Sequence, residues 1–174
     1  PEAEFNLLCR LFVQWVDRAI GEYCEAREKL LAQIEEMNRT AEEMEQTGRI
    51  IYIFDFSDHI ENCIVLTRRS YRALERLKTL PHASIDRNTR RYIEAQFDDI
   101  RYVRNYFEHV VEIATGGELP LQGSLFAVLS EDQTGIEAGG YKVSFMQLFN
   151  TLHRFHAVAL KLIDIYSGES KASL

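Results

Sequence analysis

The sequence predicts an all-α fold: a four-helix up-and-down bundle with a long first helix and a β-hairpin or loop insertion between helices three and four. Three observations support this prediction. Apolar residues recur every three or four positions through four long segments, as in helices that bury one face. Glycine or proline follows each of the first three segments and can end a helix there. The 174 residues, 46% of them hydrophobic, suffice for a single domain over residues 1–174.

The first predicted helix covers residues 5–44 and ends before Gly48. If it is unbroken, about 40 residues at about 1.5 Å each would span about 60 Å, enough to extend beyond the bundle or to pair with another chain. The alternative is a break near Asn38, because Thr40 and Glu43 match a capping box.

The second and third predicted helices follow in the centre of the chain. The second covers residues 50–80 and is stopped by Pro81. Its first residues favour a β-strand by composition, but the continuous periodicity downstream favours a helix. The third begins at a capping residue, either Ser84 or Asp86, and extends to about Ala114.

An insertion separates the third helix from the fourth. Two apolar segments, residues 124–129 and 136–143, flank a polar turn at residues 131–135, which favours a β-hairpin. A loop is the alternative, because two adjacent glycines weaken the second segment as a strand. The fourth helix is predicted over residues 144–166.

Charge is unevenly distributed along the chain. The formal net charge of −7 argues against a general nucleic-acid coat, because such proteins neutralise phosphates with lysine and arginine. Residues 61–110 nevertheless hold ten basic and seven acidic side chains, a net +3, which leaves ten basic and twenty acidic side chains, a net −10, elsewhere. The basic segment lies in the predicted second and third helices.

Other compositional features exclude several classes of protein. No apolar run approaches the roughly 18 residues that cross a bilayer and no signal-like segment opens the chain, so we predict a cytoplasmic protein without a membrane partner. Cys9, Cys24 and Cys63 lack CxxC spacing and predict buried, reduced thiols. Asp55, His59 and Cys63 are spaced by four, but the Glu-x-x-His pairs of di-metal bundles are absent. We therefore predict no metal and no cofactor.

One motif on the third predicted helix suits chemistry on RNA. Arg104 is followed by Asn105 and, after four intervening residues, by His109. Cleaving RNA without a metal requires a proton-transfer group that titrates near neutrality and a fixed cation for the phosphate charge, which His109 and Arg104 provide. At about 100° per residue, Asn105 and His109 share one face, whereas Arg104 lies about 140° from His109. The arginine and the histidine therefore need not meet within one protomer.

The motif and the four-helix layout resemble the HEPN (higher eukaryotes and prokaryotes nucleotide-binding) superfamily. In that superfamily a helical bundle carries an arginine, four to six residues, then a histidine, often with a polar residue after the arginine. The resemblance implies that Arg104, Asn105 and His109 are the catalytic residues of a metal-independent endoribonuclease. It also implies a homodimer in which two copies of the motif line one cleft.

The same resemblance suggests a biological role and partners. A toxin or antiphage effector that cleaves RNA is the expected function, with an antitoxin or regulatory protein as a partner. Some HEPN toxins carry a tyrosine two residues after the histidine, which a partner antitoxin modifies. Val111 occupies that position here, so the resemblance does not extend to that form of control.

A second interpretation needs no catalysis. Arg104 and Glu108 are four residues apart and can form a surface ion pair. The chain would then be a noncatalytic helical bundle that mediates protein–protein or nucleotide binding.

Overall fold

The computed structural model describes residues 2–48, 53–80, 85–116 and 127–172, and most of these residues are helical. The helices are α1 (Glu2–Met37), α2 (Ala41–Thr47), α3 (Ile53–Leu77), α4 (Arg87–Thr115) and α5 (Phe145–Ala172). Three short strands, β1 (Val128–Leu129), β2 (Gly135–Ala138) and β3 (Tyr141–Ser144), form an antiparallel sheet. The prediction of a mainly helical chain is confirmed, with a small sheet added. None of the described helices is long and apolar enough to cross a membrane.

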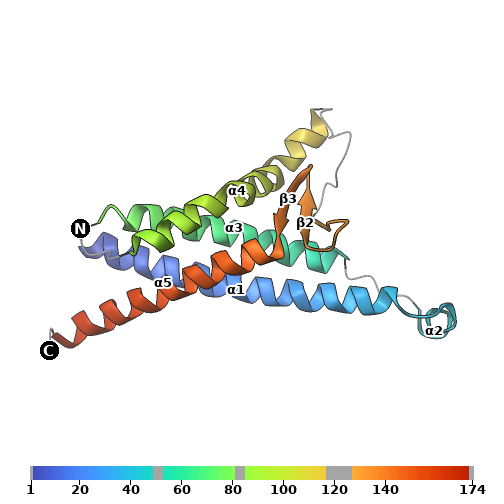
Figure 1. Cartoon of the computed structure of the whole chain (residues 1–174), viewed down its shortest axis with the longest axis horizontal. Helices are drawn as coiled ribbons and strands as arrows, with labels where there is room; N and C mark the ends of the chain where they lie inside the picture. The colour runs from blue at the N-terminus through green and yellow to red at the C-terminus, as the bar shows by residue number, and fades with distance from the viewer. Residues whose placement is uncertain (1, 49–52, 81–84, 117–126, 173–174) are drawn as a thin grey trace.

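The four long helices run in alternating directions (Figure 1). Helix α1 packs against both α3 and α5, whereas α4 lies on α3 and against β2 and β3. Figure 1 shows α4 diverging from α1 toward its C-terminal end, with the strands beneath it. The two ends of the chain lie at the same end of the molecule. Helix α4, which carries the motif, is therefore held by α3 and by the sheet.

The break between α1 and α2 shows that the unbroken first helix was a wrong prediction and that the alternative was correct. Thr40 Oγ1 accepts a hydrogen bond from the Glu43 backbone amide (3.3 Å), and the Glu43 carboxylate accepts one from the Thr40 amide (2.8 Å). Buried Glu36 pairs with Arg39 at 2.7 Å, and Arg39 also donates to the backbone oxygen of Glu43. These bonds favour a bend because they satisfy the donors that a new helix start leaves unpaired.

The core is apolar and draws on every long helix. Phe12 of α1 and Phe155 of α5 are fully buried and meet edge to face, with ring centroids 5.6 Å apart. The other large, fully buried side chains are Phe5, Val16, Ile60, Ile64, Leu74, Leu77, Ile93, Ile100, Ile136 and Leu148. Burial of such side chains contributes about 1.5–3 kcal/mol each. Cys9 and Cys63 are buried, reduced thiols as predicted, but Cys24 is exposed, so the prediction is wrong there.

The insertion forms a sheet, so the predicted hairpin is confirmed and the loop alternative is wrong for the described residues. Leu129 of β1 pairs with Ile136 of β2 across the predicted polar turn, while residues 124–126 lie outside the described residues. The second predicted strand is in fact two, because the chain turns at Gly139 and Gly140 and returns as β3. Three side chains of this second hairpin are fully buried: Ile136, Ala138 and Val143. The insertion is therefore part of the core.

One glycine of this turn lies directly against the motif helix. Gly139 has φ +58°, and a Cβ atom there would lie 2.2 Å from Cδ2 of the buried Tyr106 ring. We expect Gly139→Ala to lower the free energy of unfolding by about 1–3 kcal/mol, the usual range for overpacking a core, in urea denaturation. Gly140→Ala is the control, since φ is also positive at Gly140 but no atom lies within 4 Å of the added Cβ. Equal losses in both variants would show that backbone strain, rather than the contact with Tyr106, sets the effect.

Candidate functional site

The orientation of α4 about its own axis determines which motif residues are exposed to solvent. Asp86 caps the helix by accepting a hydrogen bond from the Thr89 amide at 2.8 Å, which confirms one of the two predicted caps. The inward-facing side chains are Ile93, Phe97, Ile100, Val103 and Tyr106, all buried. Because this face is fixed by packing, Asn105 and His109 are exposed, and Arg104 lies at the edge next to α3 with only 17% of its side chain exposed.

Arg104 contacts both of its polar neighbours along the helix. Its guanidinium forms an ion pair with Glu108, as the noncatalytic interpretation predicted, and donates a hydrogen bond to Asn105 Oδ1 at 3.1 Å. Its Nε atom is buried and has no acceptor among the described residues. Arg104 and Asn105 are therefore brought together, and one donor of the guanidinium is left for another acceptor.

His109 has a carboxylate partner that the sequence analysis missed. Its Nδ1 atom lies 2.5 Å from Glu112 Oε2, and 57% of the His109 side chain is exposed. A carboxylate oxygen can only accept a hydrogen bond, so this contact requires the proton on Nδ1, and Nε2 of the neutral ring is then an acceptor. The signal for this pair was a carboxylate three residues after the histidine on a helix.

No described hydrogen bond joins His109 to Arg104 or Asn105. Arg104 faces α3, whereas His109 and its partner Glu112 lie on the solvent side of α4. The imidazole of His109 and the guanidinium of Arg104 thus lie on different sides of the helix. One protomer alone does not place them around one phosphate.

The sequence analysis counted the arginines of α3 in the basic segment, but it did not predict that they would lie beside α4. The Arg68 guanidinium carbon lies 5.3 Å from the centroid of the Phe97 ring and 5.6 Å from that of Tyr71, and these two rings stack at 4.0 Å. Burial and the nearby charges of Arg72, Arg104 and Arg101 lower the pKa of Arg68. Helix packing thus places the arginines of α3 beside Arg104, which sequence spacing alone does not reveal.

The three candidate metal ligands on α3 have separate partners. Asp55 pairs with Lys29 at 3.6 Å, and His59 Nδ1 lies 2.6 Å from a Glu22 carboxylate oxygen. Cys63 is fully buried, and burial raises the pKa of its thiol to about 12. Within the described ranges, no three His, Cys, Asp or Glu side chains are grouped so that they could hold a metal ion.

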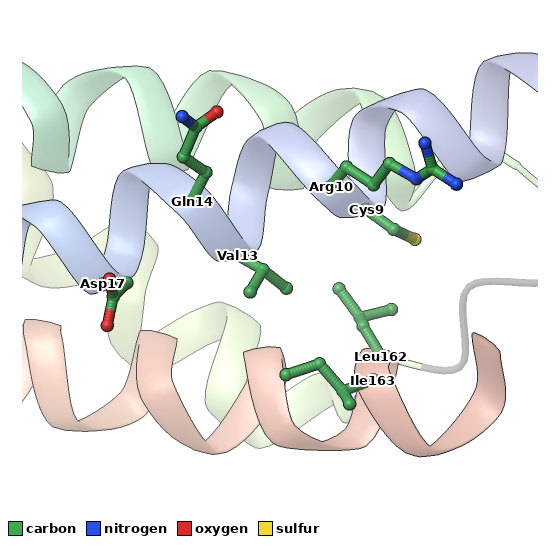
Figure 2. Close-up of a pocket in the computed structure, with 7 residues that line it drawn as sticks. All are labelled: Cys9, Arg10, Val13, Gln14, Asp17, Leu162 and Ile163. Atoms are coloured by element: carbon green, nitrogen blue, oxygen red, sulfur yellow. The ribbon is translucent and has the colours of Figure 1, made fainter. Parts of the chain in front are cut away.

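A second surface feature lies away from the motif, between α1 and α5. A pocket of about 350 Å³ lies there. Figure 2 shows Val13 and Cys9 of α1 opposite Leu162 and Ile163 of α5. The polar side chains at its rim are Arg10, Gln14 and Asp17. Helix α5 also exposes large apolar side chains, namely Met146, Phe149, Leu160 and Ile163. The side chains that face each other across this groove are mostly apolar, so it fits contact with apolar groups.

Comparison with known proteins leaves the resemblance to the HEPN superfamily resting on the motif and the helical layout. No protein-family model matches the chain, and no curated protein or solved structure is significantly similar to it.

Proposed function

We propose that this chain is a HEPN-like, metal-independent endoribonuclease that acts in the cytoplasm as a toxin or antiphage effector. The observation that carries the proposal is the exposed His109, whose Nδ1 is held by Glu112, on the same helix as Arg104 and Asn105. A histidine with one nitrogen fixed by a carboxylate presents the other nitrogen as a base in a defined orientation. The alternating long helices agree with the up-and-down bundle of that superfamily.

The proposed reaction begins when the 2′-hydroxyl of a ribose attacks the adjacent phosphorus. His109 Nε2 takes the hydroxyl proton, a new P–O2′ bond forms and the P–O5′ bond breaks. The 5′ oxygen leaves with a proton from an acid, either a protonated second His109 or water. Arg104 stabilises the charge on the phosphate oxygens, and Asn105 orients the phosphate or the arginine to which it is bonded.

The separation of Arg104 and His109 around α4 requires a homodimer in this proposal. Arg104 of one copy and His109 of the partner would face each other across a cleft formed by two copies of α4. A regulatory protein or antitoxin that covers this surface would hold the enzyme inactive.

The direct test is to incubate the purified protein with single-stranded and structured RNAs in the presence of EDTA. We expect cleavage to continue, because neither His109 nor Arg104 needs a metal for its role. The upstream products must end in 2′,3′-cyclic phosphates and the downstream products in 5′-hydroxyls, as mass spectrometry of the fragments would establish. Intact RNA, loss of cleavage in EDTA or 3′-hydroxyl ends would each contradict the proposal.

The second candidate function is a noncatalytic helical module, favoured by the apolar groove between α1 and α5 and by the Arg104–Glu108 ion pair. In that case the motif residues lie on the surface of α4 and have no catalytic role. The two functions differ in one measurable way. A noncatalytic module leaves RNA intact, and its binding to a partner depends on Phe149 or Ile163 rather than on His109.

A further inference from the structure

Four guanidinium groups gather on the α3–α4 surface beside the motif. Arg68 and Arg72 come from α3, and Arg101 and Arg104 from α4. The Arg68 guanidinium carbon lies 5.3 Å from the Phe97 ring centroid, and Phe97, Arg101 and Arg104 share one face of α4 at spacings of four and three. Arg72 lies one helical turn after Arg68 on α3, and the charges of Arg72, Arg104 and Arg101 lower the pKa of Arg68. Like charges destabilise one another unless an anion lies among them, so this cluster is suited to binding an anion.

Two N–H donors in the cluster have no acceptor. The Nε atoms of Arg68 and Arg104 are both buried, and no described residue accepts a hydrogen bond from either. Arg104 and Arg101 have carboxylate partners, Glu108 and Asp98, whereas among the described residues no carboxylate pairs with Arg68 or Arg72. Buried donors are normally satisfied, and the planar fork of a guanidinium matches phosphate oxygens. A phosphate group bound by these guanidinium groups would neutralise the cluster.

An exposed aromatic pair lies on the other side of α4. The rings of Tyr102 on α4 and Tyr141 on β3 stack with centroids 5.3 Å apart and planes 9° from parallel. They are 42% and 45% exposed, and the Arg101 guanidinium carbon lies 5.0 Å from the Tyr102 centroid. Exposed aromatic rings beside arginine stack on unpaired bases, whose faces a duplex hides. The ligand this surface favours is therefore a single strand.

The motif lies between these two groups on the helix surface. At about 100° per residue, Tyr102, Asn105 and His109 form one stripe along α4, and Arg104 lies about 160° around the helix from Tyr102. A strand that crosses α4 from the arginine cluster to the tyrosine pair therefore passes beside Asn105. His109 lies on the same exposed arc, about 10 Å farther along the axis from Tyr102.

We propose that Arg68, Arg72 and Arg104 bind a backbone phosphate of single-stranded RNA while the Tyr102–Tyr141 pair stacks on one of its bases. The inference rests on the proposed function for the identity of the nucleic acid. The binding site itself rests on the arginine cluster, its unsatisfied donors and the exposed rings. Arg68, Arg72 and the tyrosines position the strand, and only Arg104 belongs also to the catalytic motif.

The test measures binding without cleavage. The probe is a fluorescent 2′-O-methyl RNA of about 12 nucleotides, within the length range of single-strand sites, which lacks the attacking hydroxyl. Fluorescence anisotropy at several salt concentrations gives the affinity and its salt dependence. Arg68→Gln and Arg72→Gln should each weaken binding about tenfold and lower the salt slope by about 0.7. Arg69→Gln is the matched control, because Arg69 is an exposed arginine of α3 on another face of the helix.

Three further variants separate the loss of a specific contact from a loss of folding. Arg68→Lys keeps the charge but loses the fork, so the salt slope should stay while the affinity falls. Tyr141→Ala should weaken binding of the single strand roughly 5-fold to 100-fold, the range for losing one stacked base, and leave binding of a duplex unchanged. Tyr141→Phe should restore the affinity. Thermal melting establishes that each variant is folded.

The outcomes distinguish this inference from the nuclease proposal. If Arg68→Gln and Arg72→Gln behave like Arg69→Gln, the phosphate site is wrong. If Tyr141→Ala weakens duplex and single strand equally, the stacking site is wrong, and tighter binding of DNA than of RNA overturns the assignment to RNA. Binding with the expected dependences, but without cleavage of unmodified RNA, would sustain the site and contradict the nuclease. RNA cleavage at the wild-type rate in variants of Arg68, Arg72 and Tyr141 would support the nuclease and contradict the proposed binding site.

Discussion

Replacing His109 with alanine should lower the rate of RNA cleavage by roughly 100-fold to 10,000-fold, the usual cost of losing a general acid or base. Arg104→Ala should cause a loss of similar size, because the phosphate then loses its fixed cation. His109 is 57% exposed, so its removal should change the free energy of unfolding by no more than about 0.5 kcal/mol. Initial rates with a labelled RNA and thermal melts of the same samples measure both quantities.

Mixing the two inactive variants tests whether the site is shared between protomers. In a 1:1 mixture of exchanging dimers, about half of the dimers contain one copy of each variant. Each of these pairs an intact Arg104 with an intact His109 at one of its two sites, so about a quarter of the wild-type activity should return. No recovery after subunit exchange would contradict a site shared in this way. A much lower melting temperature of either variant would instead favour a structural role for the residue that it replaces.

Phe155→Ala should be the most destabilising single substitution among those considered, with an expected loss of about 3–5 kcal/mol in the free energy of unfolding. Phe155 is fully buried and meets Phe12 edge to face, so its truncation leaves a cavity between α1 and α5. Phe149→Ala is the matched control on the same helix, because 49% of Phe149 is exposed. Chemical denaturation of both variants gives the comparison, and a loss at position 149 as large as that at 155 would contradict this account of the core.

The sequence predicted the helices well where local signals and packing agree. The cap at Asp86 follows from residue type, and it is present in the fold. The first helix was predicted too long because its apolar periodicity continues through Asn38 unbroken. There the capping box of Thr40 and Glu43 outweighs periodicity, since it satisfies backbone donors that periodicity ignores.

The candidate site was predictable only in part. Glu112 follows His109 at helical spacing, so this pair could have been found from the sequence. Arg68 and Tyr141 could not, because their places beside α4 depend on how α3 and β3 pack against it. Tertiary contacts, rather than local preferences, determine the places of these two residues. The turn at Gly139 and Gly140 is different, because two adjacent glycines are a local signal for a two-residue hairpin turn.

The close approach of Gly139 to Tyr106 has an evolutionary consequence. Position 106 lies inside the motif, between Asn105 and His109, so the segment that carries the proposed chemistry is also the one that the sheet touches. A lineage that acquires a side chain at position 139 must first accept a smaller residue at position 106, because the ring fills the space that the new Cβ would occupy. The two positions should therefore change together among descendants of this chain, although 33 residues separate them (139 − 106 = 33).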